Sequence, residues 1–195
     1  MIKNELPTSE TLYAVFFAPW FDPADPRVPQ LRSDIEEIEL PPGIHPRTLC
    51  ELTPEERRQV EEGLANITRA AFSDLPALLQ VNGEPGPAWL EAFHAKASPA
   101  QVQTWLQSSN PENPQNNYLL LACELGALLA VLLQRQHPGL RWIEDLPYFE
   151  SCLFDLNRSV RIPVFHWAIK ALSGDPETGL KEKIDATLAF LRQPK

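Results

Sequence analysis

The sequence predicts an α+β domain that is mainly helical, with a central buried helix and a small antiparallel sheet. One observation is a run from Tyr118 to Leu133 that is almost wholly apolar and contains a single charge, Glu124. Because a helix that is apolar on every side must be surrounded by other elements, we expect this run to form the core. The other observations are recurrent helix-start signals and, after the apolar run, three short segments that favour β-structure.

Helix starts are marked by prolines that follow N-capping residues. Proline suits the first helical position because its missing N–H would have no partner there. The sequence Thr53-Pro54-Glu55-Glu56 is a capping box, and Ser98-Pro99-Ala100-Gln101 repeats the pattern. The other predicted starts are Gly86-Pro87, Asn113-Pro114 and Asp175-Pro176. The central helix is therefore expected from about Pro114 to Gln136, where His137-Pro138-Gly139 ends it.

Strands are predicted in two regions. Near the N-terminus, Leu12–Phe17 favours a strand and Ile35–Leu40 favours one more weakly. After the central helix, residues 140–144, 151–156 and 159–162 are expected to form an antiparallel meander. Seven prolines fall between residues 18 and 50, which indicates extended structure. We therefore expect an extended or β N-terminal segment, residues 1–50, packing on a helical α+β domain, residues 51–195.

Composition narrows the classes of function. A chain of 195 residues with 44% hydrophobic residues can bury a core without metal or disulfide support. Its three cysteines are widely spaced, so neither a disulfide framework nor a metal site is expected, and no motif indicates a cofactor. The net charge of −9 argues against nucleic acid, which requires clustered Lys and Arg. The same charge is compatible with a basic protein partner, but solubility alone is the favoured explanation.

A cytoplasmic location is expected. The chain begins Met-Ile-Lys-Asn-Glu and places Pro7 before any apolar run, which is not the layout of a signal peptide. The apolar run is shorter than the ~20 residues of a membrane span and includes Glu124. We therefore expect no membrane association.

Glu124 and His166 are the candidate catalytic residues. A carboxylate in an apolar helix is costly to bury unless it is paired, and burial raises its pKa into a range useful for proton transfer. Glu124 has three interpretations: an ion pair with Arg141, Arg161 or Lys170, a position at the one solvent-facing edge of the helix, or a catalytic or ligand-binding group beside His166 or Arg141 in a core pocket. No histidine has metal-ligand spacing, so a structural role is favoured for His166 over a catalytic one.

Gly126 predicts a close contact in the core. Glycine in a helix interior costs about 1 kcal/mol relative to alanine, so another element should compensate by approaching the backbone. The ring of Trp142 or Trp167, or a second helix, would suit that position.

Exposed groups provide the candidate binding surface. Trp20, Tyr148 and Phe149 lie in irregular stretches, where aromatic side chains form either a partner interface or part of the core. Glu55 and Glu62 belong to a charged helix face. The leading hypothesis is a non-catalytic protein-interaction module. The alternative is a small-ligand binder or enzyme that uses a buried Glu124. The sequence does not predict an oligomeric state.

Residues 118–191 contain three features in a recognisable order. They are Leu125-Gly126-Ala127-Leu128-Leu129 in the apolar run, Gly139-Leu140-Arg141-Trp142-Ile143 after it, and Val160-Arg161-Ile162-Pro163-Val164-Phe165. This order resembles bacterial domains of the DUF3806 type. The usual charged, glycine-rich loop is replaced here by Leu146-Pro147-Tyr148-Phe149. The resemblance implies a bacterial source and a small α+β unit, and the family has no established activity. Related layouts occur in immunity-like proteins, so analogy suggests binding of a basic toxin.

Overall fold

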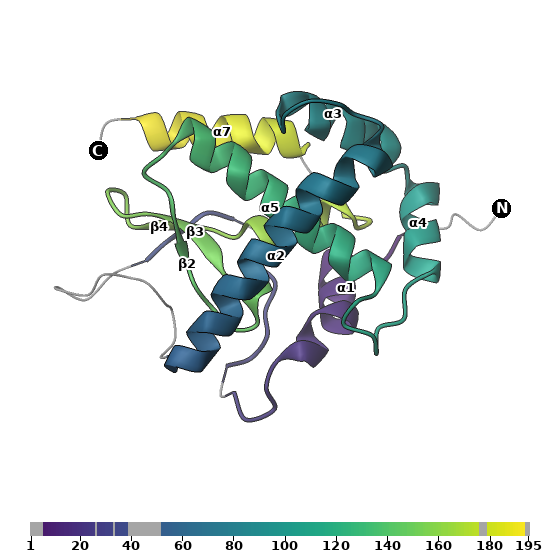
Figure 1. Ribbon diagram of the computed structural model, residues 1–195, viewed down its shortest axis with the longest axis horizontal. Coiled ribbons are helices and arrows are strands. Elements are labelled where there is room, and N and C mark those ends of the chain that lie inside the picture. The colour runs from purple at the N-terminus through teal and green to yellow at the C-terminus, as the bar shows by residue number, and fades with distance from the viewer. Residues whose placement is uncertain (1–5, 26, 33, 39–51, 176–178, 194–195) are drawn as a thin grey trace.

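The structure is a computed structural model that describes residues 6–25, 27–32, 34–38, 52–175 and 179–193. These residues form seven α-helices and a four-stranded antiparallel sheet (Figure 1), which confirms the mainly helical α+β class. The helices are α1 (Ser9–Phe16), α2 (Pro54–Leu79), α3 (Pro87–Lys96), α4 (Pro99–Gln107), α5 (Asn117–Gln136), α6 (Val164–Ala171) and α7 (Leu180–Arg192). Two short 3-10 helices are η1 (Ala18–Trp20) and η2 (Tyr148–Glu150).

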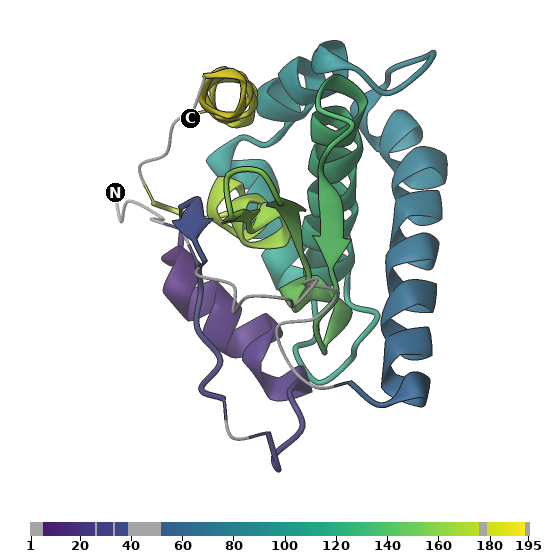
Figure 2. The same cartoon turned by 90° about the vertical axis from the view of Figure 1, so that its left-hand side faces the viewer.

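Helix α5 is the centre of the fold. It lies between α2 and α6 (Figure 2), and fourteen of its twenty residues are buried. By length and composition α5 is long and apolar enough to cross a membrane, but 78% of its apolar window is buried inside the protein. That burial is typical of a core helix, which agrees with the role expected for residues 118–133.

Capping chemistry sets most helix starts as predicted. Thr53 and Glu56 form the full capping box of α2, and the Ser98 side chain accepts a hydrogen bond from the Gln101 N–H at the start of α4. Gly86 precedes Pro87 in α3. The predicted start of the central helix is wrong by three residues. Asn116, and not Asn113, is the N-cap, and its side chain accepts from the Leu119 N–H.

The start predicted at Asp175-Pro176 falls largely on residues 176–178, which lie outside the described residues. Helix α7 begins later, at Leu180, with Gly179 at its N-cap. Asp175 itself lies in a bend after α6, so among the described residues the helix does not start there.

The strand predicted at Leu12–Phe17 is a helix. The Thr8 side chain accepts a hydrogen bond from the Thr11 N–H and so caps α1. Leu12, Tyr13, Phe16 and Phe17 are buried, whereas the two residues between these pairs are exposed. This spacing is helical, and it prevails over the β-propensity of the aromatic residues because the cap and the packing act together.

The predicted meander is confirmed. Strands β2 (Arg141–Ile143), β3 (Cys152–Asp155) and β4 (Val160–Ile162) pair in that order, and the register places Trp142 opposite Leu153 and Leu153 opposite Ile162. A fourth strand, β1 (Glu36–Glu37), pairs with β4 and gives the sheet order β1-β4-β3-β2. It lies inside the predicted range 35–40, of which residues 39 and 40 are outside the described part.

The close contact predicted at Gly126 is made by Phe165 of α6. A Cβ atom on Gly126 would lie 2.9 Å from the Phe165 Cα and would overlap its ring. Trp142, one of the two rings expected there, instead stacks on Phe165 with centroids 5.7 Å apart. Gly126 thus allows the backbone of α5 to pack directly against the Phe165 side chain of α6.

Gly126→Ala should destabilise the fold by about 1–3 kcal/mol, because the new methyl group overpacks a contact that includes backbone atoms. Urea unfolding would measure this as a lower midpoint with an unchanged slope. Gly86→Ala is the control, since its Cβ would meet nothing closer than the Glu84 carbonyl oxygen at 3.8 Å. Equal stability of the two variants would contradict tight α5–α6 packing.

Candidate functional site

A buried polar cluster joins four parts of the chain that are distant in sequence. Glu150 of η2 accepts hydrogen bonds at Oε1 from the Tyr13 hydroxyl at 2.8 Å and from His166 Nε2 at 3.0 Å. Its Oε2 accepts from Arg32 Nη1 at 2.8 Å. Glu150 and His166 are 2% and 1% exposed. The cluster therefore connects α1, the extended N-terminal segment, η2 and α6 inside the core.

Hydrogen-bond geometry fixes the protonation of His166. The Arg32 backbone N–H donates to Nδ1 at 2.7 Å, so Nδ1 carries a lone pair and no proton. The proton is on Nε2, which donates to Glu150. His166 is thus neutral, and the Arg32 and Glu150 charges compensate each other.

The charge of Glu150 is stabilised in spite of its burial. Burial alone would raise the pKa of its carboxyl, but the hydrogen bonds from His166 and Tyr13 and the positive charge of Arg32 outweigh it and lower the pKa. In the opposite direction, burial and the nearby Glu150 charge raise the pKa of the Tyr13 hydroxyl. Glu150, Tyr13 and His166 thus have all their side-chain hydrogen-bonding groups engaged in the cluster, an arrangement typical of a structural clamp.

The catalytic interpretation of His166 loses its basis in this geometry. Both ring nitrogens are engaged, and no hydrogen bond or ion pair in the described part of the chain joins His166 to Glu124. Proton transfer to a substrate would require breaking one of these buried bonds.

Glu124 lies on the one edge of α5 that approaches solvent. Leu120 and Val131 share this edge and are partly exposed, and Glu124 itself is 8% exposed. Among the described residues none forms a hydrogen bond or ion pair with Glu124. Of its three predicted partners, Arg161 pairs with Glu36 and Arg141 donates to backbone carbonyls, while Lys170 lines a separate cavity. The solvent-facing-edge interpretation of Glu124 therefore fits, and the ion-pair interpretation does not.

The charge state of Glu124 follows from these surroundings. Burial raises the pKa of its carboxyl, and the negative charge of Asp74 on α2 raises it further, to about 7. No described cation opposes this effect. Glu124 is therefore about half protonated near neutral pH.

The predicted aromatic interface is mostly interior. Phe149 is 4% exposed and packs on Phe17, with ring centroids 5.1 Å apart. Tyr148 is partly buried, and its ring lies against Gly63 of α2. The Trp20 indole donates to the Phe16 carbonyl at 2.9 Å. These rings attach the N-terminal segment and η2 to the core, which leaves little aromatic surface for a partner.

Glu55 and Glu62 are exposed as predicted. Their side chains are 60% and 58% exposed, and both accept hydrogen bonds from Arg58 between them. They lie on the face of α2 opposite the buried residues Val60 and Leu64. Figure 2 shows α2 along the outer edge of the molecule.

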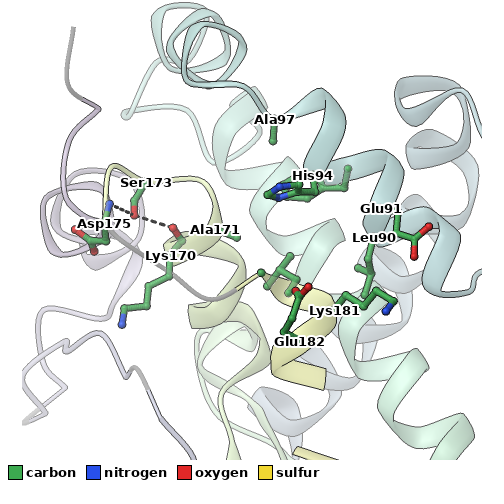
Figure 3. A pocket seen from close by; sticks show the side chains of 13 residues that line it. Leu90, Glu91, His94, Ala97, Lys170, Ala171, Ser173, Asp175, Lys181 and Glu182 are labelled. Atoms are coloured by element: carbon green, nitrogen blue, oxygen red, sulfur yellow. Dashed lines mark hydrogen bonds between the residues drawn. The ribbon is translucent and has the colours of Figure 1, made fainter. Parts of the chain in front are cut away.

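A cavity of about 410 Å³ lies between α3, the end of α6 and the start of α7. His94 projects towards it from α3 (Figure 3). Three of the polar side chains in its wall already have partners. The Asp175 carboxylate accepts from Ser9, the Ser173 hydroxyl donates to the Lys170 carbonyl, and Lys181 pairs with Asp185. Two of its wall residues, Asp175 and Gly179, also flank the undescribed residues 176–178. The other polar side chains of the wall form no hydrogen bond or ion pair within the described part of the chain, and these are Glu91, His94, Lys170 and Glu182.

Metal binding finds no support in the described residues, which contain no group of three or more His, Cys, Asp or Glu suited to an ion. The two described cysteines are buried, and burial raises the pKa of the Cys123 and Cys152 thiols to about 12. Such thiols stay protonated and unreactive at neutral pH.

Sequence reasoning missed Glu150, Arg32 and Tyr13. Arg32 lies 118 residues before Glu150, and Tyr13 lies 137 residues before it. No local motif marks them, because each is an ordinary residue until the fold brings it to the others. The only available signal for the cluster was the charge of Glu150 in a β-rich, aromatic stretch.

Comparison of the chain with protein-family models, with curated proteins and with solved structures finds no significant match. The resemblance to DUF3806-type domains therefore remains a prediction.

Glu150→Gln should cost about 2–4 kcal/mol at pH 7, because it leaves the partly buried Arg32 without its counter-charge. The folded pKa of Glu150 is lowered, so its contribution is present above the unfolded pKa near 4.5 and is lost as pH falls through the folded pKa. Urea unfolding at pH 7 and below pH 4 should show a large deficit that shrinks in acid. Glu62→Gln, on the exposed face, should leave the midpoint nearly unchanged.

Glu124→Gln should have the opposite pH dependence. The folded pKa of about 7 exceeds the usual 4.5, so the stability that protonated Glu124 contributes is lost as pH rises through 7. A neutral amide avoids this loss. Urea unfolding should find the variant close to the natural protein at pH 5 and more stable at pH 8, by at most about 3 kcal/mol. A variant that is less stable at pH 8 would show that the charged carboxylate has a stabilising partner.

Proposed function

We propose that this protein is a non-catalytic interaction module that binds a basic protein partner through the outer face of α2. The observation that carries the proposal is the exposed glutamate pair Glu55 and Glu62 on the longest helix of the described residues. The buried face of α2 packs on α5, so the opposite face is left for contacts outside the molecule.

The sign of the charge supports a basic partner. Residues 55–62 contain four glutamates and two arginines, which gives a local net charge of −2. Arg58 is shared between Glu55 and Glu62, and Arg57 is directed towards Glu144, with 4.0 Å between the charged atoms. The whole chain carries −9. A surface with this charge accelerates encounter with a basic protein and disfavours acidic ones.

The state of the core groups supports a non-catalytic role. His166 pairs with Glu150, and His137 pairs with Asp155. Glu150 also pairs with Arg32. In the cavity between α3, α6 and α7, the side chains of Ser173, Asp175 and Lys181 are engaged as well. Binding by surface charge needs none of these groups to be free.

Capture from the protein's own host would test the proposal. Native mass spectrometry of gently purified, tagged protein should show a stoichiometric basic protein, and the complex should weaken as salt increases. The double variant Glu55→Lys and Glu62→Lys should lose most of the captured partner while remaining folded by circular dichroism, because both side chains are exposed.

Glu10→Lys with Glu112→Lys is the matched control. Both residues are exposed, neither lies on α2, and the change in net charge is the same. Equal loss in both double variants would show that only overall charge matters. Undiminished capture by the α2 variant would refute the proposed surface.

A further inference from the structure

The N-terminal segment contains a strap, which comprises residues 27–32 and 34–38 and includes β1. None of these residues is buried, and their apolar side chains Leu31, Ile35 and Ile38 are only partly covered by the core. A segment with so little apolar burial opens at a lower free energy than the core helices do. The polar bonds of the strap therefore decide whether it stays docked.

Arg32 is the point at which the strap meets the buried cluster. The two ends of the strap are held by the Arg27–Asp145 ion pair and by the pairing of β1 with β4. Between them, the Arg32 backbone N–H donates to His166 Nδ1 at 2.7 Å, and its guanidinium donates to Glu150 at 2.8 Å. The middle of the strap thus depends on an acceptor that exists only while the imidazole is neutral.

His166 carries the only group of the cluster whose ordinary titration falls near neutral pH. An imidazole titrates near pH 6.5 and a guanidinium far above it. In spite of burial, the hydrogen bonds to Glu150 and the charge of Arg32 lower the pKa of its carboxyl, so Glu150 stays ionised between pH 5.5 and 8. Burial raises the pKa of Tyr13, which stays protonated over the same range.

No ionisable group outside the cluster bonds to the His166 ring in the described part of the chain. The groups that surround the ring are Tyr13 of α1, Glu150 of η2 and Arg32 of the strap, with Asp145 and Cys152 acting on Arg32. The described side chains of α5, which packs along α6, form no hydrogen bond or ion pair with it. A change in the charge of His166 therefore acts first on the strap.

We propose that protonation of His166 releases the strap, so that the cluster is a pH-sensitive latch. A protonated imidazole has two N–H donors and no acceptor. Its Nδ1–H would face the Arg32 backbone N–H, which places donor against donor where a 2.7 Å hydrogen bond now lies. The latch does not depend on the partner proposed for α2, because Figure 2 shows β1 on the side of the molecule away from that helix.

Protonation also gives Glu150 a replacement for Arg32. The carboxylate accepts from His166 Nε2 at 3.0 Å, and this contact becomes an ion pair once the imidazole is charged. One buried carboxylate can balance one buried cation but not two. Glu150 therefore has two balanced states, one with Arg32 docked and neutral His166, and one with charged His166 and Arg32 released.

Release of the strap would uncover one edge of the sheet. β1 is the outer strand at that edge, and it pairs with β4 alone. Without β1, the backbone groups of Val160–Ile162 that face it would lose their partners. A strand edge with unpaired groups is a template for pairing with another strand, so the latch would control access to β4.

Amide hydrogen exchange followed by nitrogen-15 NMR tests the latch directly. The Arg32 N–H reports the middle of the strap, and the Ile38 N–H, which donates to the Ser159 carbonyl at 2.7 Å, reports its end. Protection of both amides, relative to an unstructured chain, should fall at least about tenfold from pH 8 to pH 5.5, because one coupled proton shifts an equilibrium up to tenfold per pH unit. The Leu128 amide in α5 should stay protected.

Variants identify the group that titrates. His166→Gln has an amide that donates and accepts without titrating, so its strap should be equally protected at both pH values. His137→Gln is the matched control, because His137 is the other described histidine paired with a carboxylate. Glu124→Gln removes the carboxyl whose pKa is raised to about 7 by burial and by Asp74. Both controls should keep the pH dependence of the strap.

Four results would overturn the latch. They are equal protection of the strap at both pH values, loss at Arg32 with Ile38 still protected, full pH dependence in His166→Gln, and its disappearance in Glu124→Gln. If His166→Gln does not fold, ring nitrogen-15 NMR of the natural protein decides. The protonation of His166 Nδ1 and the loss of strap protection should share one midpoint, and separate midpoints would reject the latch.

Discussion

The burial of α5 is the constraint on which the rest of the structure depends. A twenty-residue helix with almost no polar face cannot meet water on any broad side, so α2, α6 and the segments around them have to cover it. Gly126 sets how closely α6 can approach α5, because Phe165 occupies the space that a side chain at position 126 would fill. The same ring also contacts the sheet, since Trp142 of β2 stacks on Phe165.

Charges inside this apolar framework are tolerated only as sets. Glu150 has three donors from three separate elements, and one of them, Arg32, also donates its backbone N–H to His166. Such a cluster contributes little net stability compared with apolar packing, but removal of one member leaves an uncompensated charge. The physical effect of the cluster is to fix the position of the N-terminal segment, because these hydrogen bonds form together in only one register of that segment.

Glu124 stands apart from this rule. The polar groups of the core network are engaged with one another, whereas Glu124 lies at the edge of α5 without a described ion-pair partner, and the outer face of α2 presents carboxylates that share one arginine. The proposal of a basic partner depends on the α2 face. The acidic composition by itself is consistent with simple solubility. On the fold, part of this negative charge is exposed on the outer face of α2.

The sequence by itself determined the fold class, the burial of residues 118–133, the meander and the starts of α2, α3 and α4. These follow from local chemistry: a capping residue acts within one turn, and an apolar run needs no knowledge of its neighbours to be buried. The sequence also identified Glu124, because a lone charge in such a run is unusual wherever the helix lies.

Only the tertiary structure decided which groups meet. Tyr13, Arg32, Glu150 and His166 are far apart in the chain, and no periodicity indicates that they share one cluster. The helix at Ser9–Phe16 was mistaken for a strand because aromatic propensity is local, whereas its cap and its packing are not. The sequence also left open which ring lies over Gly126 and whether Glu124 has an ion-pair partner, which it lacks among the described residues, since both depend on how α2 and α6 pack on α5. Local interactions decide which residues form helices and strands. The packing of distant helices and strands, which must bury side-chain volume and compensate buried charges, decides which polar groups come together.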